Sequence, residues 1–272
     1  MIESAAILGL GLIGGSLARD LAAKGVHVFA GDRDEAAVRA AAAQGIAQPL
    51  TWNEPLDVVV LAVPVVAARQ LLRELAGRME GVRLVTDVGS TKRSIVDTAE
   101  QMGIGDRFVG SHPLAGDHRS GWDASRTGLF EGAPVYLSPT RSTESDALEL
   151  ARELWTVVGA VPEVMDAADH DRRLAWASHL PQAASTALAR ALAEAGIARS
   201  DLGPGGRDVT RLAGSSPEMW ADILVDNADE VSTALASMAA HLSATRDAVA
   251  SSDRDRLRAL WAAANQWHQE SP

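Results

Sequence analysis

Hydrophobic residues in the first half of the chain occur as short continuous runs, separated by longer stretches in which they recur every three or four positions. Continuous runs are typical of strands covered on both faces, and the longer stretches have the period of a helix. The runs predict strands at residues 5–10, 27–30, 58–63, 83–87, 108–111 and 134–138. The stretches between them predict helices at residues 16–24, 34–44, 66–79 and 92–101. This alternation predicts a largely parallel sheet with crossover helices.

The pattern changes after about Met165. Helical periods rich in alanine cover residues 167–195, 217–251 and 253–269, with no further strand-like run. The segment LGPGGRDVT at 202–210 is expected to end the first of these helices, and residues 116–132, which have no clear period, to form a long loop. We therefore expect an α/β domain over residues 1–164 and an all-helical domain over residues 165–272.

Composition narrows the class of partner. A chain of 272 residues is long enough for two unequal domains. The formal net charge of −11 disfavours nucleic acid and anionic membranes, so we expect a small-molecule substrate. The absence of cysteine excludes disulfides and thiolate sites. The first residues, MIESAAILGLGLIGG, lack a basic leader and their apolar run is broken by glycines, which favours a cytoplasmic protein.

A glycine-rich turn lies between the first predicted strand and the first predicted helix. Gly9, Gly11 and Gly14 have GxGxxG spacing. In such a turn the first glycine permits a tight bend, the second lets the backbone approach a pyrophosphate, and the third allows close packing of helix on strand. Leu12 and Ile13, between the second and third glycines, are cofactor-binding candidates with them, and the phosphates would lie at the N-terminus of the helix that follows the turn. The spacing therefore predicts a dinucleotide-binding turn.

Asp32 follows the second predicted strand, 18 residues after Gly14, where a carboxylate binds an adenosine ribose. A carboxylate there accepts hydrogen bonds from both ribose hydroxyls and repels a 2′-phosphate, which favours NAD. The next residue, Arg33, keeps NADP open, because a guanidinium either stacks on adenine or pairs with a 2′-phosphate. The alternative for Arg33 is an ordinary solvated charge.

Polar residues after strands are the other candidates, because ligands bind at the carboxyl ends of strands in an open parallel sheet. Three clusters qualify: residues 62–64 with Val63, residues 87–92 with Ser90, and residues 110–113 with His112. His112 is the candidate acceptor for the proton of a substrate hydroxyl, although a histidine there can also be purely structural. Ser90 either orients it, contacts the nicotinamide or caps a helix.

The helical half offers a polar stripe on an apolar helix, with Ser178, Gln182 and Ser185 at helical spacing. Pro181 lies within this pattern and is expected to kink the helix. For His170 and His179, an ordinary core or surface position explains each histidine better than a functional role does. Arg207 and Arg211 are four residues apart and either bind a carboxylate of an acidic substrate or form surface salt bridges.

The clusters taken together resemble the prephenate and arogenate dehydrogenases of tyrosine biosynthesis. The resemblance rests on GLGLIGGSLA, DVVVLAVP, VTDVGSTK, GSHPLAG, HDRRLAWASHLPQ and GGRDVTRLAGSSPEMWADI, in this order. It implies an N-terminal Rossmann NAD(P)-binding domain over residues 1–164, and a C-terminal all-helical substrate and dimerisation domain over residues 165–272. The implied reaction is oxidative decarboxylation of a cyclohexadienyl ring, carried out by a homodimer.

The resemblance also implies roles for individual residues. His112 would accept the proton of the ring hydroxyl, with Ser90 beside the nicotinamide. Arg211 would bind a substrate carboxylate. The remaining members of the implied substrate site are Asp208 and Trp220 in the pocket wall, and His170, Ser178, His179 and Gln182 from the other helices.

Two departures from the family pattern bear on the substrate. Many relatives that use prephenate have a histidine where this chain has Gln182, an amide that cannot become cationic, which favours arogenate or a relaxed preference. The usual Thr-Glu after HPxAG is replaced by Asp117 and His118, so a polar network at the pocket mouth must be built differently.

Three other functions fit parts of this sequence pattern. A relative acting on 4-amino-4-deoxyprephenate would keep every motif. A β-hydroxyacid-type dehydrogenase relies on a lysine in its helical part, and residues 159–272 contain none. A non-catalytic dinucleotide-binding dimer would bind cofactor without turnover.

Overall fold

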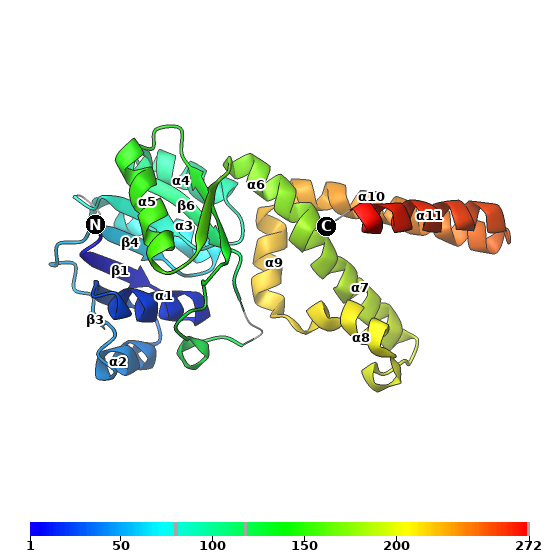
Figure 1. Cartoon of the computed structure of the whole chain (residues 1–272), viewed down its shortest axis with the longest axis horizontal. Helices are drawn as coiled ribbons and strands as arrows, with labels where there is room; N and C mark the ends of the chain where they lie inside the picture. The colour runs from blue at the N-terminus through cyan, green and yellow to red at the C-terminus, as the bar shows by residue number, and fades with distance from the viewer. Residues whose placement is uncertain (79–80, 117–118, 271–272) are drawn as a thin grey trace.

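An eight-stranded sheet forms the first part of the molecule in this computed structural model, which describes residues 1–78, 81–116 and 119–270 (Figure 1). The strands are β1 (Ser4–Leu8), β2 (His27–Gly31), β3 (Gln48–Pro49), β4 (Val58–Leu61), β5 (Leu84–Asp87), β6 (Phe108–Pro113), β7 (Pro134–Pro139) and β8 (Val161–Val164). Their order is β3-β2-β1-β4-β5-β6-β7-β8. All pairs are parallel except β6 with β7, so the prediction of a largely parallel sheet is confirmed.

Helices cover both faces of the sheet. Ala5 and Ile7 of β1 belong to one apolar core with α1 (Leu12–Ala23), α2 (Glu35–Ala43) and α5 (Ser145–Val157). Ala6 and Leu8 belong to the opposite core with α3 (Val65–Leu75) and α4 (Arg93–Gln101). Successive strand residues point to opposite faces, so a strand covered twice is apolar at every position.

The strand predictions were correct in place but missed two edge elements. β3 has two residues, and β8, with the sequence VPEV, is mostly exposed, so neither has the continuous apolar run that identified the others. The first helix was predicted to start at residue 16 and starts at Leu12, because the glycine-rich turn already forms its first turn. Among its described residues, the expected loop at 116–132 contains the short 3₁₀ turn η3 (Trp122–Ala124) and non-helical turns at 127–132.

The second part of the described chain is helical, as predicted. Its helices are α6 (Ala167–Leu174), α7 (Leu180–Glu194), α8 (Pro204–Val209), α9 (Pro217–Asp226), α10 (Ala228–Ala250) and α11 (Arg254–Glu270). The segment predicted to end a helix itself contains α8, because Pro204 lies in the first turn, where its missing N–H costs nothing. The stretch predicted as one helix at 217–251 is divided at Asn227 into α9 and α10.

The irregularity expected at Pro181 takes the form of a π-helical turn, η4 (Ala175–His179), directly before α7. The backbone stays helical from α6 through this turn into α7, so Pro181 lies within one helical stretch, directly after the π turn. Such single π turns widen a helix locally and re-aim its side chains.

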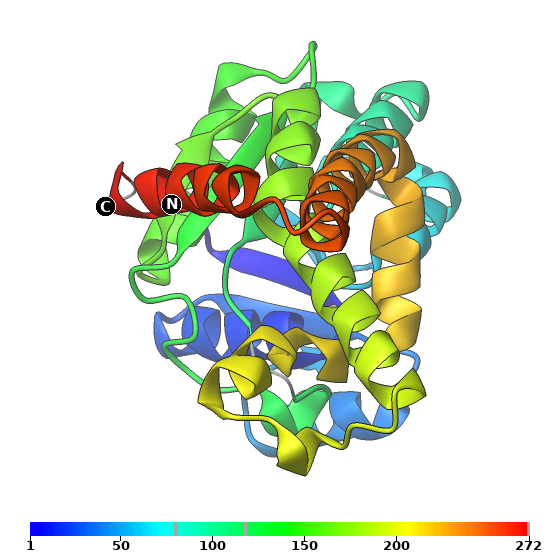
Figure 2. The ribbon, with the colours of Figure 1, turned by 90° about the vertical axis from the view of Figure 1, so that its right-hand side faces the viewer.

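The pair α10 and α11 extends away from the sheet (Figure 1), and α10 is seen nearly end-on when the molecule is viewed from the helical side (Figure 2). None of the residues of α11 is buried. Across the described residues, no helix is both long enough and apolar enough to span a bilayer.

Candidate active site

The glycine-rich turn has the shape that a dinucleotide requires. Gly9 has φ of 103°, and a Cβ at this position would collide with the carbonyl of Ala62. A Cβ on Gly14 would collide with the carbonyl of Gly9, so both positions exclude any side chain. A Cβ on Gly11 would meet nothing within 4 Å, which leaves open space where a pyrophosphate would approach. Val63 packs against the turn from the end of β4.

Asp32, directly after β2, fixes this turn. Its Oδ2 accepts a hydrogen bond from the backbone N–H of Leu10 at 2.5 Å, and its Oδ1 accepts one from the N–H of Asp34 at 2.8 Å. Gly11, Leu12 and Ile13 begin α1 without a capping side chain or an acidic residue, so the positive end of the helix is available to an anion. Arg33 is exposed beside Asp32. These residues fit an adenine dinucleotide.

His112 lies at the carboxyl end of β6 beside a cavity of about 320 Å³. The strand is longer than predicted and includes His112, which is 9% exposed. The cavity brings together Ser90 after β5, Ser178 of the π-helical turn and Trp220 of α9, all three of them candidates from the sequence. Its other lining residues are Leu114, Tyr136, Arg173, Leu174, Ala177, Met219 and Ile223.

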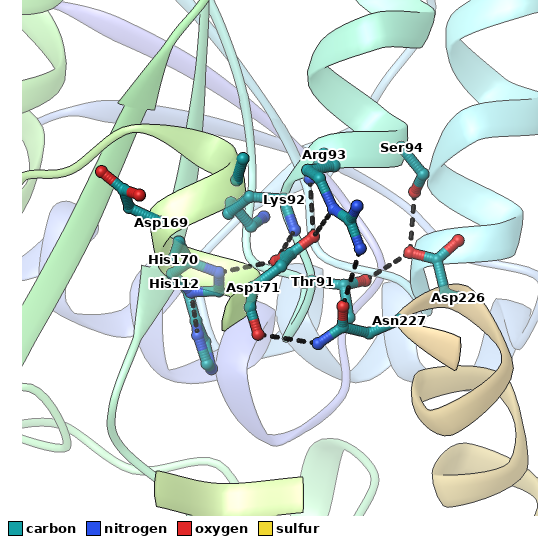
Figure 3. Close-up of polar contacts among 12 residues, drawn as sticks. Thr91, Lys92, Arg93, Ser94, His112, Asp169, His170, Asp171, Asp226 and Asn227 are labelled. Carbon is teal, nitrogen blue, oxygen red and sulfur yellow. Dashed lines mark hydrogen bonds and ion pairs between the residues drawn. The ribbon is translucent and has the colours of Figure 1, made fainter. Parts of the chain in front are cut away.

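Behind His112, two further side chains complete a chain of hydrogen bonds (Figure 3). His112 Nδ1 lies 2.9 Å from His170 Nε2, and His170 Nδ1 lies 2.8 Å from Asp171 Oδ1. An ionised Asp171 only accepts hydrogen bonds, so His170 Nδ1 carries the hydrogen and its Nε2 is bare. That bare nitrogen accepts from His112 Nδ1, and His112 Nε2 is left as a bare acceptor.

Electrostatics keep the two histidines of this hydrogen-bonded chain neutral. Burial, together with the charges of His170, Lys92 and His179, holds the pKa of His112 well below its ordinary value of 6.5. Burial also lowers the pKa of His170. Burial opposes ionisation of Asp171, but hydrogen bonds from His170 and from the backbone N–H groups of Arg93 and Lys92 outweigh it and lower its pKa. His112 is therefore a neutral acceptor at neutral pH.

Lys92 lies fully buried next to this chain and pairs with the equally buried Asp87. Asp87 also accepts hydrogen bonds from the backbone N–H groups of Gly89 at 2.8 Å and Ser111 at 3.1 Å. A buried ion pair needs such additional bonds to offset its loss of hydration. Through its bond from Ser111, Asp87 joins the end of β5, which Ser90 follows, to β6, which carries His112.

Two carboxylates of the helical part hold the N-terminus of α4 (Figure 3). Asp171 accepts from the backbone N–H groups of Lys92 at 2.7 Å and Arg93 at 3.0 Å. Asp226 accepts from the hydroxyls of Thr91 at 2.6 Å and Ser94 at 2.7 Å. The α4 terminus is thus capped from the other part of the chain, and Asp171 joins this docking contact to His170.

A second cavity of about 1220 Å³ lies next to the first, and Met219 and Trp220 line both. Arg211, in the short turn η6 (Arg211–Gly214), and Gln182 of α7 line this larger cavity. Gln182 is buried, and its Nε2 donates to the carbonyl of Leu212 at 2.8 Å. The amide therefore holds the turn that carries Arg211.

The remaining candidates do not line either cavity. His179 is buried and lies edge-on to Trp220, with the two ring centres 6.0 Å apart. Burial lowers the pKa of His179 to about 4. Asp208 is exposed on α8 and is not among the residues that line either cavity. Arg207 and Arg211 do not share a helix face, because α8 ends at Val209, and Arg207 instead donates to the carbonyl of Leu202 at 2.6 Å.

Sequence reasoning missed Asp171, Lys92, Tyr136 and Arg173. The adjacent pair His170-Asp171 was visible in the sequence, but its contact with α4 was not. Tyr136 pairs with His112 across the antiparallel strands β6 and β7, a register that no local signal gave. Asp117 and His118 lie outside the described residues.

Three comparisons place the chain among known proteins. The family model for the prephenate dehydrogenase nucleotide-binding domain matches residues 17–164, and the model for the dimerization domain matches residues 166–263. A cyclohexadienyl dehydrogenase of Zymomonas mobilis is 34% identical over 93% of this chain and 90% of its own length. A prephenate dehydrogenase of Bacillus subtilis is 34% identical over 85% of this chain and 66% of its own length. The crystal structure of prephenate dehydrogenase from Aquifex aeolicus with hydroxyphenyl propionate and NAD⁺ has a TM-score of 0.86 at 30% identity, over 99% of this chain and 98% of that one.

Proposed function

This chain belongs to the prephenate dehydrogenase family, and from that premise we propose that it catalyses the NAD-dependent oxidative decarboxylation of a cyclohexadienyl acid. One observation carries the proposal. His112 is neutral, its Nδ1 is occupied by His170, and it lines a cavity beside Ser90 at the same sheet edge as the glycine-rich turn. The bare Nε2 is the acceptor that a hydroxyl needs when it becomes a carbonyl.

In this reaction the protein forms no covalent bond with the substrate and transfers only a proton. Bound NAD supplies the acceptor for the hydride that leaves ring C4. His112 takes the proton of the C4 hydroxyl through Nε2 as that hydride leaves, and the C4 oxygen becomes a carbonyl. When the C1 carboxylate leaves as CO2, its bonding electrons enter the ring and give a phenolate, and His112 returns the proton to the C4 oxygen, which forms the phenol. Aromatisation drives this step, so orientation is the main task of the site.

We assign the two cavities to the two ends of the substrate. The ring lies in the smaller cavity between His112, Ser178 and Trp220, with Ser90 towards the nicotinamide. Arg211 in the larger cavity binds the carboxylate of the three-carbon side chain, because a guanidinium is suited to bidentate carboxylate binding. In this proposal residues 1–164 bind NAD, and residues 165–272 supply substrate contacts and the dimer interface.

The substrate is tested by initial rates of NADH and NADPH formation, measured separately with prephenate and with arogenate. Because the Gln182 amide holds the Arg211 turn and carries no charge, we expect arogenate to be turned over at least as fast as prephenate, and NAD to be preferred. Turnover of 4-amino-4-deoxyprephenate alone would favour that alternative. NAD binding without any turnover would favour the non-catalytic dimer.

Replacing Asp32 with alanine is expected to lower kcat/KM for NAD by about 10- to 100-fold, because a charged hydrogen-bond acceptor for the ribose is lost. The same change removes the repulsion of a 2′-phosphate beside Arg33, so kcat/KM for NADP should rise. The ratio of the two values is the measurement. An unchanged ratio would contradict the placing of the ribose at Asp32.

The arm formed by α10 and α11 is proposed as the contact between two copies in a homodimer. It exposes Leu242, Val249 and Trp261, each at least 58% accessible, and large apolar side chains on neighbouring helices are typical of an interface. The family model that matches this part is named for dimerization.

Light scattering on the wild-type protein is expected to give twice the mass of one chain. A double variant, Leu242→Glu with Trp261→Glu, places charges in the proposed contact and should give the mass of a single chain. Val161→Glu, which changes an apolar residue of β8 that is 58% exposed, is the matched control and should remain a dimer. A double variant that is still fully dimeric would place the interface elsewhere.

A further inference from the structure

We propose that Arg173 binds the ring carboxylate of the substrate, the group that is lost as CO2. This inference rests on the proposed function and adds a second anion-binding residue to it. Sequence reasoning offered Arg207 and Arg211 for substrate carboxylates, whereas the fold places Arg173 at the smaller cavity and Arg211, together with Arg199, at the larger one.

Arg173 points into the cavity of His112 because of its position on α6. Arg173, Leu174, Ala177 and Ser178 all line that cavity, and their spacing puts them on one side of α6 and the π-helical turn that continues it. The guanidinium carbon lies 5.6 Å from the centre of the Tyr136 ring. Tyr136 is paired with His112 across β6 and β7, and the arginine, the tyrosine and the proposed proton acceptor all line the same cavity.

The neighbouring arginine shows what an ordinary surface charge does on this helix. Arg172 pairs with Asp169 at 2.9 Å and lies 3.9 Å from Glu230. Within the described residues, Arg173 has no carboxylate partner, and its guanidinium lies over the face of the Tyr136 ring. Stacking on an aromatic face leaves the N–H edge of a guanidinium free to bind a carboxylate through two parallel hydrogen bonds.

Arg173 brings positive charge to the His112 cavity. Of the described residues that line the His112 cavity, Arg173 alone carries a charge, since His112 itself is held neutral. The chain as a whole has a formal charge of −11. A substrate with two carboxylates needs local positive charge to enter such a protein, and the cavity of the reacting ring supplies it only through Arg173.

The shape of the substrate indicates which of its two carboxylates Arg173 binds and which Arg211 binds. In a cyclohexadienyl acid such as prephenate, the hydroxyl is on C4, and the ring carboxylate and the side chain are both on C1, at the opposite end of the ring. With C4 at His112, the ring carboxylate remains in the smaller cavity near Arg173. The side chain extends past Met219 and Trp220 into the larger cavity, where its carboxylate meets Arg211.

The test compares Arg173→Gln with the matched control Arg172→Gln. KM is measured for the substrate that the wild type prefers, and the inhibition constant is measured for its aromatic product, which lacks the ring carboxylate. In Arg173→Gln we expect KM to rise by about 10- to 100-fold, the effect of losing a hydrogen-bonded charge, with product binding changed by less than about threefold. Arg172→Gln should leave both values unchanged, and Arg211→Gln should weaken both.

Arg173→Lys keeps the charge without the bidentate geometry and should recover part of the lost affinity. Because Arg173 is exposed, thermal melting of these variants should match that of the wild type. An Arg173→Gln variant with the KM of Arg172→Gln would overturn the inference. Equal weakening of substrate and product would also overturn it, because the arginine would then bind the side chain. Absence of wild-type turnover would instead overturn the proposed function, on which the inference rests.

Discussion

His112→Asn is expected to lower kcat by about 10²–10⁴-fold, the usual contribution of a positioned acid or base. Asparagine is close to histidine in size and keeps a polar group near His170, but it cannot take and return a proton at the C4 oxygen. The affinity for NAD should be unchanged, because His112 lies outside the glycine-rich turn. Steady-state rates and a cofactor titration measure the two effects separately.

The pH dependence gives a second check on the same residue. Since the pKa of His112 is held well below 6.5, the imidazole stays neutral and able to accept a proton at mildly acidic pH. In the wild type kcat/KM should therefore be flat from neutral pH to below 6.5 and fall only in more acidic solution, where His112 becomes protonated. A His112→Asn variant with the wild-type rate at neutral pH would contradict the assignment.

Asp171→Asn is expected to produce the second largest loss, about 10²-fold or more in kcat/KM, because the hydrogen-bonded chain would no longer fix the tautomer of His112. The substituted amide would present an N–H group as well as an oxygen, so His170 would no longer be obliged to keep its hydrogen on Nδ1. Raising the pH should not restore the rate, because the defect is the position of a hydrogen and not an excess proton.

Asp226→Asn is the matched control for this variant. Asp171 and Asp226 both hold the N-terminus of α4 from the helical part, but only Asp171 contacts His170. We expect both variants to unfold at lower urea concentration, and only Asp171→Asn to lose its rate. If Asp226→Asn lost as much activity as Asp171→Asn, domain docking alone would explain the effect.

The parts of the molecule whose conformation depends on residues close in the sequence were predictable from the sequence. The strands covered on both faces were found because most of them are apolar along most of their length, and the edge strand β8 was missed because VPEV is not. The glycine-rich turn was found from spacing alone, because its conformation depends on local contacts: Gly9 has a positive φ, and a Cβ on Gly14 would collide with the carbonyl of Gly9. His112 was found because it follows a run that reads as a strand.

The parts that depend on distant contacts were not predictable. Asp171 is an ordinary helix residue in the sequence, and its importance comes from hydrogen bonds to Lys92 and Arg93, 79 and 78 residues away. His170 was expected beside the substrate but lies behind His112, because α6 packs against the sheet at that point. Gln182 lines the larger cavity, but the hydrogen bond from its Nε2 to the carbonyl of Leu212, 30 residues away, could not be predicted from the sequence. Each of these roles is set by tertiary packing.

The stoichiometry of a single reaction mixture tests the central claim most directly. Wild-type protein is incubated with NAD and with prephenate or arogenate, and the NADH, CO2 and aromatic product are all quantified. The proposed function predicts that the three are formed in equal amounts with at least one of the two acids. NADH formed without CO2, or no NADH with either acid, would contradict it.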